Sequence, residues 1–293
     1  MTSVVQDIVN GLGLGGTYAL LALGLALVFS ILRLINFAYG ELMTITGYIL
    51  FFALGAGLAT PLVIVLGIVG AGVASVAMER AVFRPFRNAD ATTLLLTSFA
   101  LSVALQTLFQ ATISANAKGV DLSFIPGLIF IAGVQVGGTQ LVSTVTSLVV
   151  LVCLGTFLMR TTLGVSIRAT AENFHVARLM GIRANRVIVS SFLVSGLLAG
   201  VAGVLWVIQI ASVNPLMGTT PVLKAFVAAI VGGLGSLRGV VLAGFLLGFL
   251  ETLLQTYLPG SASGYRDAML WVILIGVLLL RPQGLFAPAA ERA

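Results

Sequence analysis

Charged residues are scarce in this sequence. They make up 8% of the 293 residues, whereas hydrophobic residues make up 59%, and the mean hydropathy is +1.15. Since soluble globular domains carry about 25% charged residues, this composition excludes an ordinary soluble domain and indicates a protein with several membrane-spanning segments. The net charge of +6 does not point to nucleic acid, because most basic residues lie in loops, where they report membrane topology.

The residue types that most enzymes need are also nearly missing. The chain has one cysteine, Cys153, and one histidine, His175, which excludes an internal disulfide and leaves a serine triad without a base in the membrane. No cluster of Cys, His, Asp and Glu has the spacing of a metal site. Neither Lys118 nor Lys224 ends the glycine-rich loop that binds ATP phosphates. We therefore expect no catalytic residue, cofactor or metal here, and ATP-driven transport would need another subunit.

Glycine, by contrast, is abundant, with 34 residues. The run Gly11-Leu-Gly-Leu-Gly-Gly resembles a nucleotide-binding loop, but no strand precedes it and an apolar segment surrounds it. Close packing of helices in lipid is therefore the better explanation. The pair Gly196 and Gly200 and the pair Gly244 and Gly248 have the same small-residue spacing and predict the same kind of contact.

Long apolar segments predict an all-α integral membrane protein, a polytopic helical bundle of about 8–9 transmembrane helices in one transmembrane domain over residues 1–293. Basic residues cluster in two of the loops, and the first of these contains Arg80, Arg84 and Arg87. The positive-inside rule then places the N-terminus outside and the C-terminus in the cytoplasm. The apolar segments lie at residues 8–32, 42–58, 61–78, 93–113, 141–159, 187–208, 222–236, 240–257 and 268–281.

Polar and glycine residues interrupt the apolar segments at 33–41 and at 231–239. Non-helical backbone at membrane depth persists only where protein or a water-filled path covers it, and interrupted helices are typical of translocation sites. The two breaks thus predict broken or re-entrant helices that face each other, and they are compatible with an inverted structural repeat. Plain loops with glycine for tight turns are the alternative. The predicted path residues are Asn36, Tyr39, Gly40, Glu41, Gly232, Gly233, Gly235 and Ser236.

Glu41 and Glu251 are the carboxylates nearest to apolar segments. A carboxylate inside a membrane is by default a candidate functional group. Glu41 could equally cap the helix that begins at Leu42. Glu251 stands beside Thr252 and Gln255 on a polar stripe, which favours an interhelical hydrogen bond.

Residues 160–186 form a basic island with five arginines, which places this loop in the cytoplasm. Within it, 171–180 reads as a short helix with Thr170 as its N-cap and Gly181 as its stop. Three apolar side chains would share one face of this helix: Val176, Leu179 and Met180. Such a face suits docking onto a cytoplasmic partner or lying on the lipid surface, and the residues alone leave both open.

Eight short motifs occur in order along residues 11–286. They are Tyr18-Ala-Leu-Leu-Ala-Leu-Gly-Leu, Asn36-Phe-Ala-Tyr-Gly-Glu-Leu, Glu79-Arg-Ala-Val-Phe-Arg-Pro-Phe-Arg, Arg168-Ala-Thr-Ala-Glu-Asn, Leu179-Met-Gly-Ile, Pro215-Leu-Met-Gly, Lys224-Ala-Phe-Val-Ala-Ala-Ile-Val-Gly-Gly-Leu-Gly-Ser and Arg281-Pro-Gln-Gly-Leu-Phe. With these motifs the chain resembles the permease subunits of ABC importers for branched-chain amino acids, of the LivH type, and the related urea and amide permeases.

The resemblance implies a pore formed as a heterodimer with a second, related permease subunit in a bacterial cytoplasmic (inner) membrane. It also implies two cytoplasmic ATPase subunits, a substrate-binding protein, and a coupling helix within 160–186 that docks into the ATPase. Many ABC permeases show Glu-Ala-Ala-x-x-x-Gly there; Ala177 and Gly181 keep that spacing, but His175 stands where the glutamate belongs. The coupling residues implied are Ala171, Glu172, Ala177, Met180 and Gly181.

We therefore expect an importer permease subunit, without an ATPase site of its own, that forms half of the path for branched-chain or other small neutral amino acids. A permease for urea or short-chain amides is one alternative. An ion-coupled secondary transporter is another, and it would need ion or proton sites near the membrane centre. For that class the sequence offers only Glu41 and Glu251.

Overall fold

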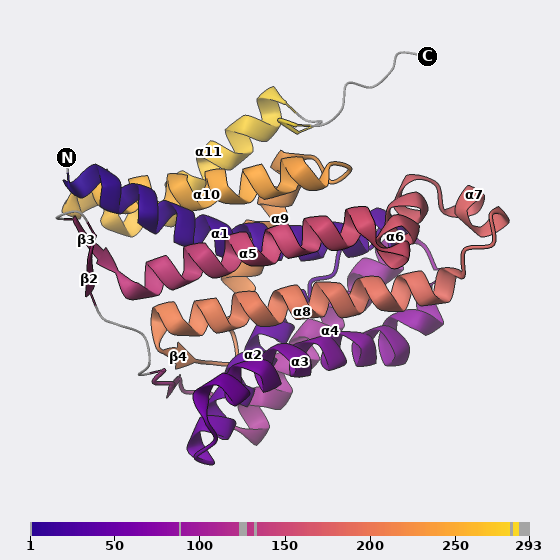
Figure 1. The fold of residues 1–293 in the computed structure, drawn as a ribbon, viewed down its shortest axis with the longest axis horizontal. Helices are drawn as coiled ribbons and strands as arrows, with labels where there is room; N and C mark the ends of the chain where they lie inside the picture. The colour runs from indigo at the N-terminus through magenta and orange to yellow at the C-terminus, as the bar shows by residue number, and fades with distance from the viewer. Residues whose placement is uncertain (1, 88, 123–127, 132–133, 282–283, 287–293) are drawn as a thin grey trace. The chain divides into compact units, whose positions relative to one another are not determined.

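The computed structural model describes residues 2–87, 89–122, 128–131, 134–281 and 284–286, and most of them lie in eleven α-helices (Figure 1). The helices are α1 Thr2–Leu32, α2 Tyr39–Gly55, α3 Thr60–Met78, α4 Ala91–Thr112, α5 Gly138–Arg160, α6 Thr162–Glu172, α7 Phe174–Leu179, α8 Ala184–Ile210, α9 Thr219–Gly232, α10 Leu237–Tyr257 and α11 Arg266–Leu280. A π-helical turn η1, Glu79–Phe83, and a 3₁₀ turn η2, Arg84–Phe86, follow α3, and a 3₁₀ helix η3, Gly260–Tyr265, precedes α11.

Among the described residues, seven helices are long and apolar enough to cross a membrane. One of them is the run Thr60–Phe86, in which α3 continues through η1 and η2. The helices α2 and α9 are apolar but shorter, with 17 and 14 residues. Each of these elements overlaps one of the apolar segments predicted from the sequence. The run Thr60–Phe86 extends eight residues beyond the predicted 61–78, so Arg80 and Arg84 lie in helical turns and not in a plain loop. The helical, polytopic membrane fold is thereby confirmed.

Short strands, which were not predicted, pair in the connections between helices. Strand β1, Lys118–Gly119, pairs antiparallel with β4, Ser212–Val213. Strand β2, Leu128–Ile131, pairs antiparallel with β3, Val134–Gly137, and α5 follows directly. Such pairing gives the backbone groups of these connections the hydrogen-bond partners that helices supply elsewhere.

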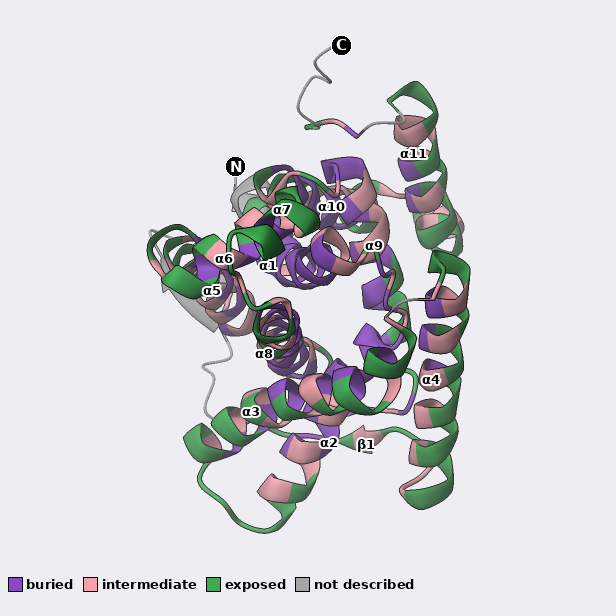
Figure 2. Cartoon of the chain, turned by 90° about the vertical axis from the view of Figure 1, so that its right-hand side faces the viewer, coloured by how far each residue is buried: buried purple, intermediate pink, exposed green. Residues whose placement is uncertain are grey.

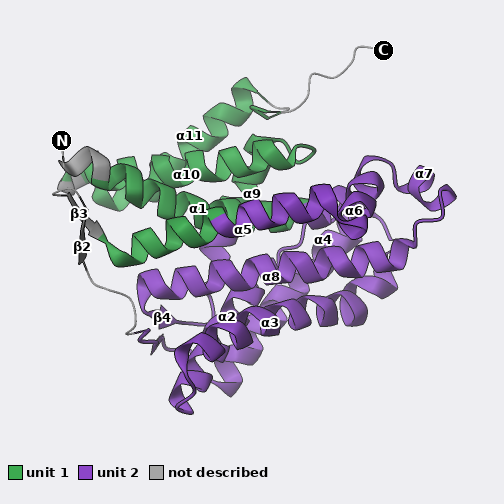
Figure 3. Ribbon diagram, in the orientation of Figure 1, with its two compact units in different colours: residues 1–26, 125–148, 223–293 green, residues 27–124, 149–222 purple. Residues whose placement is uncertain are grey.

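The chain divides into two compact units (Figure 3). Unit 1 comprises residues 1–26, 125–148 and 223–293, and unit 2 comprises residues 27–124 and 149–222. The helices α1, α5 and α9 contribute residues to both units, whereas α10 and α11 belong to unit 1 and α2, α3, α4, α6, α7 and α8 belong to unit 2. Each unit therefore combines segments that lie far apart in the sequence.

Small residues bring α1 and α10 into close contact in unit 1. A Cβ atom on Gly15 would lie 2.8 Å from the Cα atom of Phe245 and 2.9 Å from its carbonyl oxygen. Gly248 packs against the backbone of Gly15, and Gly244 packs against Ala19. The pair Gly244 and Gly248 thus forms a helix contact, as predicted from its spacing.

Two other glycines of the same run face α5 instead. A Cβ atom on Gly13 would lie 3.0 Å from the carbonyl oxygen of Gln140, and Gly16 packs against the side chain of Ser147. The glycines of the run thus contact two different neighbours, since Gly15 faces α10 whereas Gly13 and Gly16 face α5. The glycine-rich run is a helix-packing element, which confirms the interpretation made from the sequence.

In unit 2, α8 packs against α2 and α3, and Figure 2 shows that α8 is largely buried. A Cβ atom on Gly200 would lie 2.8 Å from the Cα atom of Ile68, and Gly196 also faces α3. On the other side, a Cβ atom on Gly203 would lie 3.2 Å from the Cα atom of Met43 in α2. The predicted contact at Gly196 and Gly200 is therefore present.

We predict that Gly15→Ala lowers the free energy of unfolding by about 1–3 kcal/mol, because the added methyl group overfills a contact between two backbones. The matched control is Gly276→Ala in α11, where a Cβ atom meets nothing within 4 Å. Unfolding of both variants in mixed detergent micelles measures the difference. Equal stability of the two variants would contradict the packing role of Gly15.

Candidate functional site

The connection between α1 and α2 is the first predicted break, and it is non-helical over residues 33–38. Arg33 ends α1 with a left-handed φ of 53°. The Ser98 hydroxyl of α4 accepts a hydrogen bond from the Phe37 N–H at 3.2 Å and lies 3.0 Å from the Ile35 carbonyl oxygen. A side chain of the protein therefore bonds this backbone, as non-helical chain at membrane depth requires.

The helix that supplies this hydroxyl, α4, begins at Asp90. The Asp90 carboxylate accepts hydrogen bonds from the Thr93 hydroxyl at 2.6 Å and from the Thr93 N–H at 3.2 Å. These bonds hold the pKa of Asp90 below its ordinary value, and the bond from the Thr93 hydroxyl contributes most. With its start capped, α4 presents Ser98, Ser102 and Gln106 at four-residue spacing on one face.

The helix α2 begins about halfway along its neighbours. With 22 residues, α4 is about 33 Å long, close to the thickness of a hydrocarbon core of about 30 Å. Ser102 lies near its middle and bonds the first turn of α2. The Tyr39 hydroxyl, at the start of α2, donates to the Ser195 carbonyl oxygen near the middle of α8 at 3.1 Å. Such a start is that of a broken helix, as predicted for 33–41.

Glu41 lies in the first turn of α2 and is almost completely buried, with 1% of its surface exposed. Its Oε1 atom accepts from the Ser102 hydroxyl at 2.9 Å and from Gln106 Nε2 at 2.8 Å. Within the described part of the chain, Glu41 Oε2 and Asn36 Oδ1 have no hydrogen-bond partner. The N-cap of α2 is Ala38, and the carboxylate bonds α4 and not its own helix. The capping alternative for Glu41 is therefore not what the structure shows.

A second short helix begins beside the first. The turn that precedes α9 ends at Gly218, and a Cβ atom on Gly40 would lie 2.8 Å from the Gly218 carbonyl oxygen. The Thr219 hydroxyl, at the start of α9, lies 3.4 Å from Gln106 Nε2. The N-terminal ends of α2 and α9 thus meet next to the Glu41 carboxylate.

This second turn, before α9, was not predicted. The chain leaves α8 at Ala211 with a left-handed φ of 50° and turns through residues 214–218. Asn214, Pro215 and Gly218 are residue types typical of turns, so a local signal was present. The contact of this turn with Gly40 could not be predicted from a local pattern, because it joins residues far apart in the chain.

The second predicted break lies in unit 1, between α9 and α10. Gly233 has a φ of 87°, and the Ser236 N–H donates to its carbonyl oxygen at 2.8 Å. The Ser236 hydroxyl accepts from the Gly239 N–H at 3.1 Å and caps α10. Gly232 packs on the Gly239 backbone, and Gly235 is exposed. This segment is a tight, capped turn. Its local geometry is therefore that of the second alternative considered for 231–239, a plain loop with glycine for a tight turn. That it faces the first break stays a prediction.

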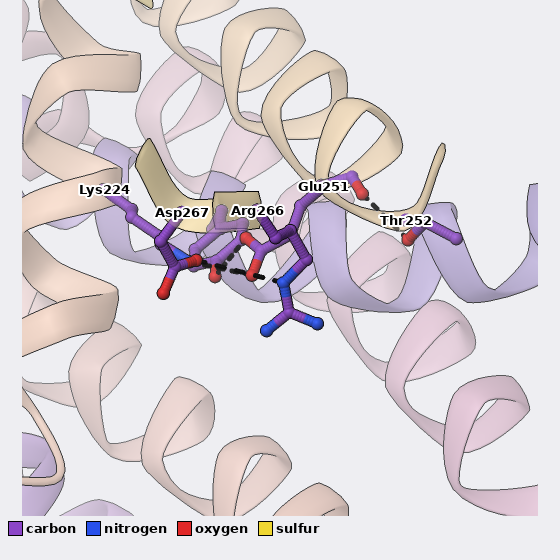
Figure 4. A network of polar contacts seen from close by, with 7 residues as sticks. Lys224, Glu251, Thr252, Arg266 and Asp267 are labelled. Carbon is purple, nitrogen blue, oxygen red and sulfur yellow. Dashed lines mark hydrogen bonds and ion pairs between the residues drawn. The ribbon is translucent and has the colours of Figure 1, made fainter. Parts of the chain in front are cut away.

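Charged side chains from several helices of unit 1 form one network around the buried Lys224 and Glu251 (Figure 4). Lys224 of α9 is 3% exposed, and its Nζ atom donates to Glu251 at 2.8 Å and to Asp267 at 3.1 Å. The Tyr18 hydroxyl of α1 donates to the other Glu251 oxygen at 2.8 Å. Both carboxylate oxygens of Glu251 are therefore bonded, which confirms its prediction as an interhelical hydrogen-bonding group.

We predict that Lys224→Met lowers the free energy of unfolding by about 3–5 kcal/mol, because it leaves the buried Glu251 carboxylate without its cation. Adding Glu251→Gln to this variant should restore most of the loss. Asp267→Asn is the control: the Asp267 side chain is 55% exposed, and exposed ion pairs contribute about 1 kcal/mol at most. Unfolding in detergent micelles measures all three, and a single variant as stable as the double variant would refute this assignment.

The basic island folds as two helices, α6 and α7, so the single helix predicted at 171–180 is wrong. Asn173 separates them, and its side-chain oxygen accepts from the Val176 N–H at 3.0 Å as the N-cap of α7. Thr170, predicted as the cap, lies inside α6 and donates to the Ser166 carbonyl oxygen at 2.7 Å. Asparagine bonds nearby backbone groups readily, which favours caps over helix interiors.

The end of α7 follows the prediction. Gly181 has a φ of 82°, its N–H donates to the Arg178 carbonyl oxygen, and the Ile182 N–H donates to the Ala177 carbonyl oxygen, both at 3.1 Å. These two bonds form a Schellman motif, in which a left-handed glycine ends the helix. The stop at Gly181 is confirmed.

The predicted apolar face of this region is exposed, as Figure 2 shows for α7. Its members are exposed by 49% for Val176, 74% for Leu179 and 78% for Met180. Ala177, in contrast, is buried, so it packs inside the chain and does not belong to this face. Ala171 and Glu172 close α6, and Glu172 is exposed.

Residues 7–280 match the family described as "Branched-chain amino acid transport system / permease component". The chain is 33% identical to the high-affinity branched-chain amino acid transport system permease proteins BraD of Pseudomonas aeruginosa and LivH of Escherichia coli K12, over 98% of this chain and 97% of each relative. It is 30% identical to the probable branched-chain amino acid transport permease protein LivH of Methanocaldococcus jannaschii, over 91% of this chain and 87% of that protein. No solved structure matches.

The family match runs through all of the apolar helices, from α1 to α11. The relatives align over nearly their whole length, so the similarity is not confined to one motif. This confirms the resemblance on which the expected permease function rested. The chain belongs to the family of permease components of branched-chain amino acid transport systems.

Proposed function

We propose that this chain forms half of the path by which an ATP-driven importer carries branched-chain amino acids across a bacterial cytoplasmic membrane. BraD and LivH are named as permeases of branched-chain amino acid transport, and the sequence has no P-loop of its own. The importer would contain a second related permease as heterodimer partner, two cytoplasmic ATPase subunits and a substrate-binding protein. The C-terminus of this chain would lie in the cytoplasm, as the distribution of its arginines indicates.

The observation that carries the proposal is the Oε2 atom of Glu41 at the start of a broken helix, which has no hydrogen-bond partner among the described residues. An amino acid crosses as a zwitterion, and its ammonium group forms its strongest hydrogen bonds with a carboxylate. The N-terminal ends of α2 and α9 bring partial positive charge to the same place, which suits the substrate carboxylate. Because Glu41 is buried, the path would have to open before substrate reaches it.

We therefore assign Asn36, Tyr39, Gly40 and Glu41 to the path. Gly232, Gly233, Gly235 and Ser236 remain predicted to border it. Urea and short amides carry no formal positive charge, so they would leave the Glu41 carboxylate without a counter-charge. An amino acid supplies that charge, which favours amino acids over the urea and amide alternative.

We predict that Glu41→Gln lowers leucine uptake about tenfold or more in proteoliposomes that contain the complete importer. The reason is the loss of one charge-assisted hydrogen bond to the substrate ammonium group, which corresponds to a change of about that size. Glu41→Asp keeps the charge and should retain part of the uptake. Asp121→Asn, which removes an exposed carboxylate of the same unit, is the control and should transport normally.

Two outcomes of this experiment would contradict the proposal. Undiminished leucine uptake by an assembled Glu41→Gln importer would show that the Glu41 carboxylate does not bind the substrate. Uptake of radiolabelled urea by the wild-type importer, without uptake of leucine, would replace the proposed substrate class.

We further propose that α7 is the coupling helix and that its exposed face docks into an ATPase subunit. Leu179 and Met180 stand at the end of a helix whose last turn is held by the Schellman motif at Gly181. Large apolar side chains so exposed indicate an interaction surface. Since Ala177 is buried, it would hold the helix in place and not contact the partner.

We predict that Leu179→Asp combined with Met180→Asp abolishes substrate-stimulated ATP hydrolysis, because carboxylates in an apolar groove lose their hydration without gaining partners. Ala115→Asp, which adds a charge to an exposed connection outside the basic island, is the control. Stimulated ATP hydrolysis of the reconstituted complex is the measurement. Full stimulation in the double variant would contradict docking and would indicate that the apolar face of α7 lies on the lipid surface.

A further inference from the structure

The end of α3 and the start of α8 border a cavity of about 720 Å³ in unit 2. Arginine is the commonest residue of its wall, with Arg80, Arg84, Arg87 and Arg186. Two apolar side chains, Leu163 and Val189, also border it, and the remaining lining residues are polar or acidic: Glu79, Thr162, Asn185 and Ser190. Cations and apolar groups around one open space suit an amphiphilic ligand with a negative charge.

Among the residues that the structure describes, only one of these four arginines has a carboxylate partner. Arg87 forms an ion pair with Glu79, which is fully buried, and donates to Asn185 Oδ1 at 2.6 Å. For the other three arginines, the described residues provide no carboxylate within 4.0 Å. Unpaired cations that share one space repel each other, so an anion between them would be stabilised. The guanidinium fork fits the oxygens of a phosphate group in particular.

The cavity continues an apolar stripe along α3. Exposed apolar side chains recur every three or four residues on one face of this helix: Leu62, Val65, Val69 and Val73. Arg80 and Arg84 follow on the same face by helical spacing. The stripe thus changes from apolar to cationic at Arg80, as a surface does where it passes from acyl chains to headgroups.

The lengths of the two helices agree with this boundary. Thr60–Phe86 and Ala184–Ile210 have 27 residues each, or about 40 Å, and exceed a hydrocarbon core of about 30 Å. The excess of about 10 Å corresponds to roughly seven residues. It places the segments that border the cavity within the headgroup layer on the side that the arginines mark as cytoplasmic.

We infer that this cavity binds the headgroup phosphate of an anionic phospholipid from the cytoplasmic leaflet. Arg80, Arg84 and Arg186 would contact the phosphate oxygens, and the acyl chains would lie along the stripe on α3. Free phosphate has the same anionic chemistry but no apolar group that would contact the stripe on α3. An acidic side chain of a partner protein would not need the apolar wall either, so the amphiphile fits the observations best.

The test compares lipid bound to the purified full chain. The variant Arg84→Gln with Arg186→Gln removes two cavity cations, and Arg168→Gln with Arg178→Gln removes two exposed arginines of the basic island that do not line the cavity. Each protein is incubated with mixed micelles that contain phosphatidylglycerol or phosphatidylcholine, and native mass spectrometry counts the bound lipid. Loss of about fivefold in affinity is expected for each cavity arginine removed. The control variant should bind like wild type.

Several outcomes would overturn the inference. If both variants bind phosphatidylglycerol equally well, Arg84 and Arg186 do not contact the lipid. If the wild-type chain binds phosphatidylcholine as well as phosphatidylglycerol, the site does not require a negative charge. If inorganic phosphate alone protects the chain from heat as well as phosphatidylglycerol does, the ligand is free phosphate. If the ATPase subunits displace the lipid from the assembled complex, the cavity belongs to that interface. Unchanged thermal stability of both variants in phosphatidylcholine excludes misfolding as the cause of lost binding.

Discussion

Backbone groups that leave a helix inside a membrane must find partners in the protein, and the proposed path depends on how α4 meets this requirement. Ser98, Ser102 and Gln106 stand four residues apart on one face of that helix. The first bonds the non-helical chain before α2, and the other two bond Glu41. One polar face therefore holds both the break and the carboxylate that follows it, so α2 can begin at the depth of the membrane centre.

Features with a local cause could be predicted from the sequence. Hydropathy located the apolar helices, small-residue spacing located the glycine contacts, and the need for a left-handed residue located the stop at Gly181. The helix at 171–180 was wrong because Asn173 can either continue a helix or cap the next one, and pattern alone does not decide between them. The contacts of Gly40 with Gly218 and of Lys224 with Glu251 join distant segments, so no local pattern contained them.

The two intramembrane glutamates show how burial separates structure from function. Glu251 has a bonded partner for each oxygen, Tyr18 on one side and Lys224 on the other. Such a group stabilises only the arrangement of helices that brings its partners together. Glu41 is as deeply buried, but one of its oxygens has no hydrogen-bond partner in the part of the chain that the structure describes. An unsatisfied buried acceptor raises the free energy of the resting protein, and a ligand that bonds it would regain that energy on binding.

The cost of burying a charge without a partner also explains where the other charged residues of the chain lie. Lys224, the most buried cation among the described residues of unit 1, is held between two carboxylates. The cavity arginines that have no carboxylate partner among the described residues lie at the end of α3 and the start of α8, which we infer to be in the headgroup layer. There an unpaired cation is tolerated, because water and lipid phosphate can reach it. Charges without protein partners are thus found where a second component can supply the partner. Lipid would do so at the rim, and the ammonium group of a passing amino acid would do so at Glu41.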